Sequence, residues 1–157
     1  MADSRGSIVV GIKPGLPHRL SDVAAQTALD LGCALIFAHV EVTSVLMEWD
    51  PAEVRDAESL APPVDEDMAA LARWLEESVK EALADSVVPW SMRILGGDPA
   101  TALARLADDV EARMIVVGSR RPGAMHRVEE IMGGSVAGKL VTHQERPVLV
   151  VPMGEHR

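Results

Sequence analysis

Residues 97–120, GDPATALARLADDVEARMIVVGSR, carry the clearest structural pattern of this 157-residue sequence. Asp98 followed by Pro99 is typical of a helix start, because aspartate caps free N–H groups and proline fits the first helical position. Apolar residues then recur at helical spacing, at Leu103, Leu106, Ala107 and Val110. The segment ends in the apolar run 114–118, MIVVG, which predicts a buried strand. A helix that leads directly into such a strand is half of a parallel α/β unit.

The same alternation extends over the rest of the sequence. Further apolar runs occupy 7–11 (SIVVG), 34–42 (ALIFAHVEV), 91–95 (SMRIL) and 147–151 (PVLVV). Their β-branched residues predict strands that are buried on both faces, as in a parallel sheet. Helical periodicity covers 20–31, which stops at the C-capping Gly32, then about 65–85, and a short segment after Ser135. We therefore predict an α/β fold with a five-stranded parallel sheet and helices on both faces.

Length and composition predict one domain over residues 1–157. With 15 basic and 24 acidic residues the net charge is −9, which opposes non-specific binding to nucleic acid or to an anionic membrane. The single Cys33 excludes an intramolecular disulfide. No apolar run approaches the roughly 20 residues of a membrane span, and we expect a cytoplasmic protein. The acidic, proline-rich residues 43–66 are expected to form a long surface loop or a short extra helix.

Ligands of parallel α/β sheets bind beyond the carboxyl ends of the strands, where the strand order reverses. With the order 3-2-1-4-5, the loops that follow Gly11 and Gly118 flank that position. With the order 2-1-3-4-5, the loop GGDP at 96–99 replaces the second of them. Hydrophobic periodicity leaves both orders open.

Glycine-containing segments near these strand ends match the known phosphate-binding patterns only in part. GGSVAGKL at 133–140 fits the first seven places of a P-loop, but Leu140 stands where the magnesium-binding hydroxyl belongs. The five histidines are dispersed and form no catalytic motif, so we expect no enzyme. His39 lies in an apolar strand and is expected to be a hydrogen-bonded core residue.

One anion site remains plausible on physical grounds. Gly134 and Ser135 precede a helix, whose free N–H groups and dipole favour phosphate. The alternative is that Ser135 only caps that helix, and the residues leave both open.

Three segments resemble the universal stress protein family: IVVG near the start, residues 97–120, and GSVAGKLVTHQERPVLVVP at 134–152. The resemblance implies the strand order 3-2-1-4-5, a role in the stress response, ATP or AMP as ligand, and homodimers formed through the last strand, Pro147–Val151. The apolar character of that edge strand agrees with such a dimer, because an exposed apolar edge needs covering.

Nucleotide-binding members of this family carry G-x2-G-x9-G-[ST] after the fourth strand and an aspartate at the end of the first. Here Lys13 stands in place of the aspartate. Counted from Gly118, the pattern requires glycine at positions 121 and 131, which are Arg121 and Ile131. Counted from Arg120, it finds Gly123 and Gly133 but ends in Gly134 instead of serine. The loop is three residues longer than the family pattern.

Two hypotheses follow from this altered loop. In the first, the crevice binds an adenine nucleotide or another phosphate-bearing ligand, with charge from three basic residues and backbone contacts from the helix start. Its residues are Gly11, Lys13, Gly118, Arg120, Arg121, Gly123, Gly133, Gly134 and Ser135. In the second, the arginine side chains fill the crevice, and the protein is a homodimeric interaction module that does not bind ATP.

Overall fold

The computed structural model describes residues 6–15, 17–41, 66–119 and 135–153. Within them lie five strands: β1 (Ser7–Ile12), β2 (Ala34–Glu41), β3 (Trp90–Gly96), β4 (Met114–Gly118) and β5 (Val148–Val151). The helices are α1 (His18–Leu31), α3 (Glu66–Ala82), α4 (Pro99–Asp109) and α6 (Val136–His143). The connection predicted over 43–66 lies outside the described residues, except for Glu66, which begins α3.

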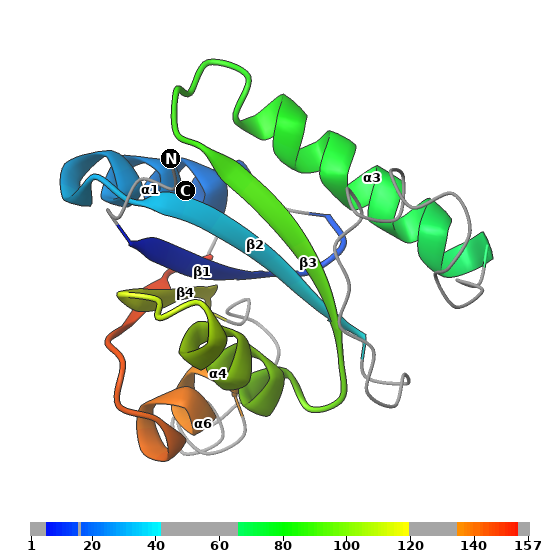
Figure 1. The fold of residues 1–157 in the computed structure, drawn as a ribbon. Coiled ribbons are helices and arrows are strands. Elements are labelled where there is room, and N and C mark those ends of the chain that lie inside the picture. Colours follow the sequence, from blue (N-terminus) through cyan, green and yellow to red (C-terminus); the bar gives the residue numbers. More distant parts are fainter. Residues whose placement is uncertain (1–5, 16, 42–65, 120–134, 154–157) are drawn as a thin grey trace.

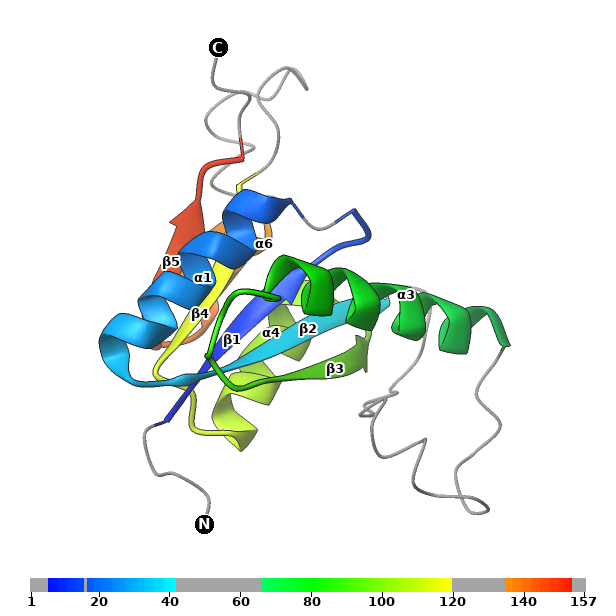
Figure 2. The same ribbon diagram turned by 90° about the horizontal axis from the view of Figure 1, so that it is seen from above.

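All five strands belong to one parallel sheet in the order β3-β2-β1-β4-β5. This confirms the predicted fold class and selects the order 3-2-1-4-5. Helices α1 and α3 cover one face of the sheet, and α4 and α6 cover the other (Figure 1). The view from above shows α1 and α3 on the same side of the sheet, with α1 running along the direction of β4 and α3 along that of β2 (Figure 2).

Alternate residues of the strands point into two separate hydrophobic cores. Ile8, Val10 and Phe37 pack towards α1 and α3, in the first core. Val9 and Ile115 pack towards α4 and α6, in the second. Both faces of the central strands are therefore buried, which explains why their sequences are continuously apolar.

The helix ends follow the predicted local chemistry. Asp98 accepts a hydrogen bond from the backbone N–H of Thr101 at 3.0 Å and caps α4, with Pro99 in the first helical position. Gly32 ends α1 in the left-handed conformation, at φ +65°, which costs glycine no steric strain. Helix α1 begins at His18, two residues before its predicted start, because the polar first turn carries no apolar periodicity. None of the described helices is long and apolar enough to cross a membrane.

Candidate functional site at the carboxyl ends of β1 and β4

The strand order reverses between β1 and β4. These strands are neighbours, in the register Ile8↔Met114 and Val10↔Val116. From β1 the chain turns to α1 on one face, whereas α6, which follows β4, lies on the opposite face (Figure 1). The chain segments that leave β1 and β4 thus go to opposite faces of the sheet. The site predicted for the order 3-2-1-4-5 therefore lies between these two strand ends, at the carboxyl edge.

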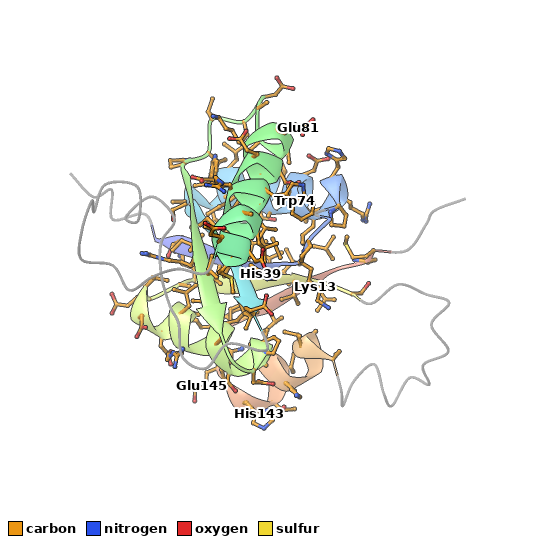
Figure 3. The ribbon with its side chains drawn as sticks, turned by 90° about the vertical axis from the view of Figure 1, so that its right-hand side faces the viewer. Lys13, His39, Trp74, Glu81, His143 and Glu145 are labelled. Atoms are coloured by element: carbon orange, nitrogen blue, oxygen red, sulfur yellow. The ribbon has the colours of Figure 1, made fainter. Side chains whose placement is uncertain are left out.

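Lys13 lies at the exit of β1. It is the first residue after the strand, its side chain is exposed, and it lies at the edge that faces the viewer in Figure 3. Gly15, two residues further on, has φ +82° and lets the chain turn towards α1. Neither the first turn of α1 nor that of α6 holds an acidic side chain. Lys13 thus presents a positive charge at the predicted position.

Both strand-end glycines have packing roles. A Cβ atom on Gly11 would lie 3.0 Å from Cδ1 of Leu103 and 3.3 Å from Cγ1 of Val117. A Cβ atom on Gly118 would lie 2.8 Å from Cγ of Met153. The absence of a side chain at both positions therefore makes room for protein atoms. The predicted ligand contact of Gly11 and Gly118 stays a prediction.

Ser135 is buried and caps α6. Its hydroxyl oxygen accepts a hydrogen bond from the backbone N–H of Gly138 at 3.0 Å. This is the capping role that the sequence offered as one of two alternatives. Capping fixes the direction of the helix and leaves the positive end of its dipole at the carboxyl edge, so the capping and anion-binding roles of this segment are compatible.

An ion pair joins the first turns of α4 and α6, and the sequence analysis did not predict it. Lys139 Nζ lies 3.4 Å from Oδ1 of Asp98, and both side chains are about half exposed. The pKa of Asp98 lies below its ordinary value, chiefly because the carboxylate accepts the backbone hydrogen bond of Thr101, and also because it accepts that of the Thr101 hydroxyl. Lys139 contributes less to this shift. The pair links the start of α6 to the start of α4.

The C-terminal segment 151–153 is held by hydrogen bonds from the end of β4 and from α1. Ser119 donates its N–H to the carbonyl of Val151 at 2.9 Å, and its hydroxyl accepts the N–H of Met153 at 3.0 Å. From α1, Arg19 Nε donates to the carbonyl of Pro152 at 2.9 Å. Arg19 and Ser119 were not predicted as residues of this region. Hydrogen bonds to distant backbone N–H and C=O groups leave no pattern in the sequence that could have found these two residues.

His39 is the buried histidine of this edge. It is 6% exposed, lies on β2 beneath α3, and its ring atom Nδ1 is 3.4 Å from the carbonyl oxygen of Ile12 (Figure 3). The predicted hydrogen-bonded core histidine is therefore confirmed.

The central part of the predicted loop lies outside the described residues. This concerns Arg120, Arg121, Gly123, Gly133 and Gly134. The structure thus brings Gly11, Lys13 and Gly118 to one edge of the sheet, with Ser135 at the start of α6. Within the described ranges, no group of three or more histidine, cysteine or acidic side chains could hold a metal ion.

Comparison with known proteins identifies the family. A model of the universal stress protein family matches residues 5–152. The stress response protein NhaX of Bacillus subtilis is 34% identical over 101 residues, which are 62% of this chain and 55% of that protein. This chain thus spans about half the length of that relative.

Solved structures of universal stress proteins share the fold. One, solved in complex with cAMP, is 24% identical, has a TM-score of 0.64 and covers 94% of this chain and 96% of its own. Another, from Archaeoglobus fulgidus, is 18% identical with a TM-score of 0.68 and covers 93% of this chain and 98% of its own. The Archaeoglobus fulgidus protein in complex with dAMP is also 18% identical, with a TM-score of 0.64 over 93% and 97% of the two chains. Because the family model covers nearly all of the sequence, this chain belongs to the universal stress protein family.

Proposed function

We propose that this chain is a regulatory protein of the stress response that binds an adenine nucleotide, or another phosphate-bearing ligand, at the carboxyl edge between β1 and β4. Membership of the family supports the stress response. The cAMP and dAMP complexes of structural relatives support the class of ligand. The proposed role is binding rather than catalysis.

The observation that carries the proposal is the charge at the point where the strand order reverses. Exposed Lys13 leaves β1 there, and the N-terminal end of α6 lies at the same carboxyl edge. A lysine ammonium and a helix dipole both stabilise phosphate, although the protein as a whole carries a net charge of −9. A local positive site in an acidic protein favours a specific anion over non-specific binding.

The first experiment asks whether any nucleotide binds. Purified protein is heat-denatured, and the supernatant is analysed for released nucleotide. ATP, AMP and cyclic AMP are then titrated calorimetrically into protein freed of ligand. The proposal expects a bound nucleotide or measurable heat for at least one of them, together with no release of inorganic phosphate from ATP on prolonged incubation. The absence of ligand and of heat for all three contradicts it.

A second function is favoured by the packing of the glycines. Leu103 occupies the space that a side chain on Gly11 would need, and Met153 does the same at Gly118. Both glycines are therefore required for packing even without a ligand. We therefore keep a homodimeric interaction module that does not bind ATP as the alternative. A dimer with no affinity for nucleotides is the result that favours it.

Both proposed functions include a homodimer that forms through β5. This strand is at the end of the sheet order, and Val150 on it is 40% exposed. An exposed edge strand of this composition is stabilised when a second copy pairs with it. Sedimentation velocity then gives one species of about twice the mass of 16.8 kDa.

A further inference from the structure

The ring of His39 contacts the last residue of β1, Ile12. The two residues are register partners in the parallel pair β1–β2. The ring atom Nδ1 lies 3.4 Å from the carbonyl oxygen of Ile12, within the range of a long hydrogen bond. Since a carbonyl oxygen can only accept, the ring must carry its proton on Nδ1 to make this contact.

The other ring nitrogen has no hydrogen-bond partner among the residues that the structure describes. Nε2 is buried and lies 3.6 Å from Oε2 of Glu41, which is two residues further along the same strand and on the same face. A buried ring nitrogen without a hydrogen bond costs free energy. The neighbouring buried residues Phe37 and Ile94 are apolar, and an apolar residue would fill this place in the core without that cost. Core packing alone therefore does not explain a histidine here.

The carbonyl that His39 contacts belongs to the same planar peptide unit as the N–H of Lys13. The described chain contains no cis peptide, so this C=O and this N–H point in opposite directions. Strand β1 lies between β2 and β4, and His39 engages the carbonyl from β2. The β1–β2 ladder already turns this carbonyl towards β2, because the pairing of Ile12 with His39 places the N–H of Val40 opposite it. The Nδ1–H of His39 is a second donor to the same oxygen. The N–H of Lys13 therefore points towards β4, the side of the candidate site.

We propose that His39 is a positioning residue of this site. Its Nδ1–H reinforces the last hydrogen bond of the β1–β2 ladder at the peptide unit between Ile12 and Lys13. It thereby keeps the end of β1 in the one direction that presents Lys13 to an anion. The expected effect on nucleotide binding rests on the proposed function. The effect on Lys13 itself is independent of any ligand.

Two substitutions of His39 separate its two nitrogens. In His39→Asn the amide nitrogen takes the place of Nδ1 and can still donate to the carbonyl of Ile12. In His39→Gln the amide extends to the place of Nε2, next to Glu41, and that donor is lost. We expect the Asn variant to keep the affinity for AMP or ATP within about threefold. We expect the Gln variant to lose about five- to 30-fold, within the range for a residue that acts on a binding site without touching the ligand.

The deciding readout is the backbone amide resonances of Lys13 and Gly15 in the protein without ligand. Both variants lose the ring current of the imidazole, so the difference between the two variants is the informative quantity. The resonances should stay closer to those of the wild type in the Asn variant than in the Gln variant. If the wild type binds no nucleotide, the proposed function fails while these resonances still test His39. Equal resonances and equal affinities in both variants overturn the inference.

A measurement on the wild-type protein covers the case in which a variant does not fold. Long-range proton–nitrogen spectra of the His39 ring report which nitrogen carries the proton. A protonated Nδ1 supports the proposal. A bare Nδ1 cannot donate to Ile12 and overturns it without any substitution.

Discussion

Met153 occupies the space that a side chain on Gly118 would need. Its Cγ atom lies 2.8 Å from the position of a Cβ atom on that glycine, and its Sδ atom lies 3.2 Å away. The last described residue of the chain therefore packs directly on the end of β4. The hydrogen bond from its N–H to Ser119 holds it there.

Gly118→Ala should consequently destabilise the protein by about 1–3 kcal/mol, because the added methyl group forces Met153 out of its place. Urea unfolding measures this change. In the double variant Gly118→Ala with Met153→Ala the clash disappears. The free energy of unfolding that this variant loses should be smaller than the sum of the losses in the two single variants. Strict additivity would show that Met153 does not pack on this glycine in solution.

Gly11→Ala should also lower the free energy of unfolding by about 1–3 kcal/mol, because its Cβ atom would press on Leu103 and Val117 inside the second core. Leu103→Val shortens the side chain and should recover part of this loss. Thermal unfolding of the single and double variants measures the effect. A stability equal to that of the wild type in Gly11→Ala contradicts the packing role.

Asp98 should contribute stability that depends on pH. Its pKa in the folded protein is lowered from the ordinary value of 3.8, chiefly by the backbone hydrogen bond from Thr101. A lowered folded pKa means that the contribution is fully present above that ordinary value and is lost as the pH falls through the folded pKa. At neutral pH, Asp98→Ala should cost about 0.5–2 kcal/mol, the range for helix caps, and Asp98→Asn much less.

Urea unfolding at neutral pH and at about pH 3 tests the sign of this linkage. The difference between the wild type and Asp98→Ala should shrink in acid. A difference that grows in acid would mean that the carboxylate is not stabilised by its contacts in the folded state.

Arg121→Ala should weaken binding of the phosphate-bearing ligand by about 1–3 kcal/mol if the guanidinium makes a charge-assisted hydrogen bond. Lys13→Ala should act in the same direction, because it removes the charge at the exit of β1. Lys80→Ala is the matched control: it removes the same charge from an exposed position in the last turn of α3. Calorimetric affinities that fall equally in Lys13→Ala and Lys80→Ala would indicate only a general effect of charge.

A charge in the middle of β5 should separate the proposed dimer. Val150 is the better position for it, because its side chain is 40% exposed, whereas Leu149 packs partly against the first core. Val150→Asp should therefore give a folded species of half the sedimentation mass. A charge at Leu149 would also disturb the core, so it serves as a comparison for misfolding. An unchanged mass for Val150→Asp excludes pairing through β5.

The elements were predictable because strands buried on both faces are apolar throughout, and capping residues mark the helix ends. The strand Met114–Gly118 was predicted with its correct limits. Asp98 and Gly32 were correctly predicted as capping residues. Errors occur where burial does not decide the ends. The run predicted at 91–95 extends to Trp90 and Gly96, because both residues pair with β2 in the hydrogen-bonded ladder.

The candidate site was predictable in its place but not in its contacts. Lys13 and Ser135 could be located from the sequence, since they follow a strand and precede a helix. The contacts of Arg19 and Ser119 with residues 152 and 153 join parts of the chain that are more than 30 residues apart. Such contacts depend on the tertiary fold, and no local pattern encodes a side chain that bonds to a distant backbone atom.

The close packing on Gly11 and Gly118 bears on how relatives of this protein should be judged. Each glycine makes room for a neighbouring side chain, Leu103 in one case and Met153 in the other. Selection for a well-packed sheet can therefore keep both glycines in a protein that has lost its ligand. Counting motif glycines then overstates how many members of such a family bind nucleotides, and the size of the residues that pack on each glycine is the better criterion.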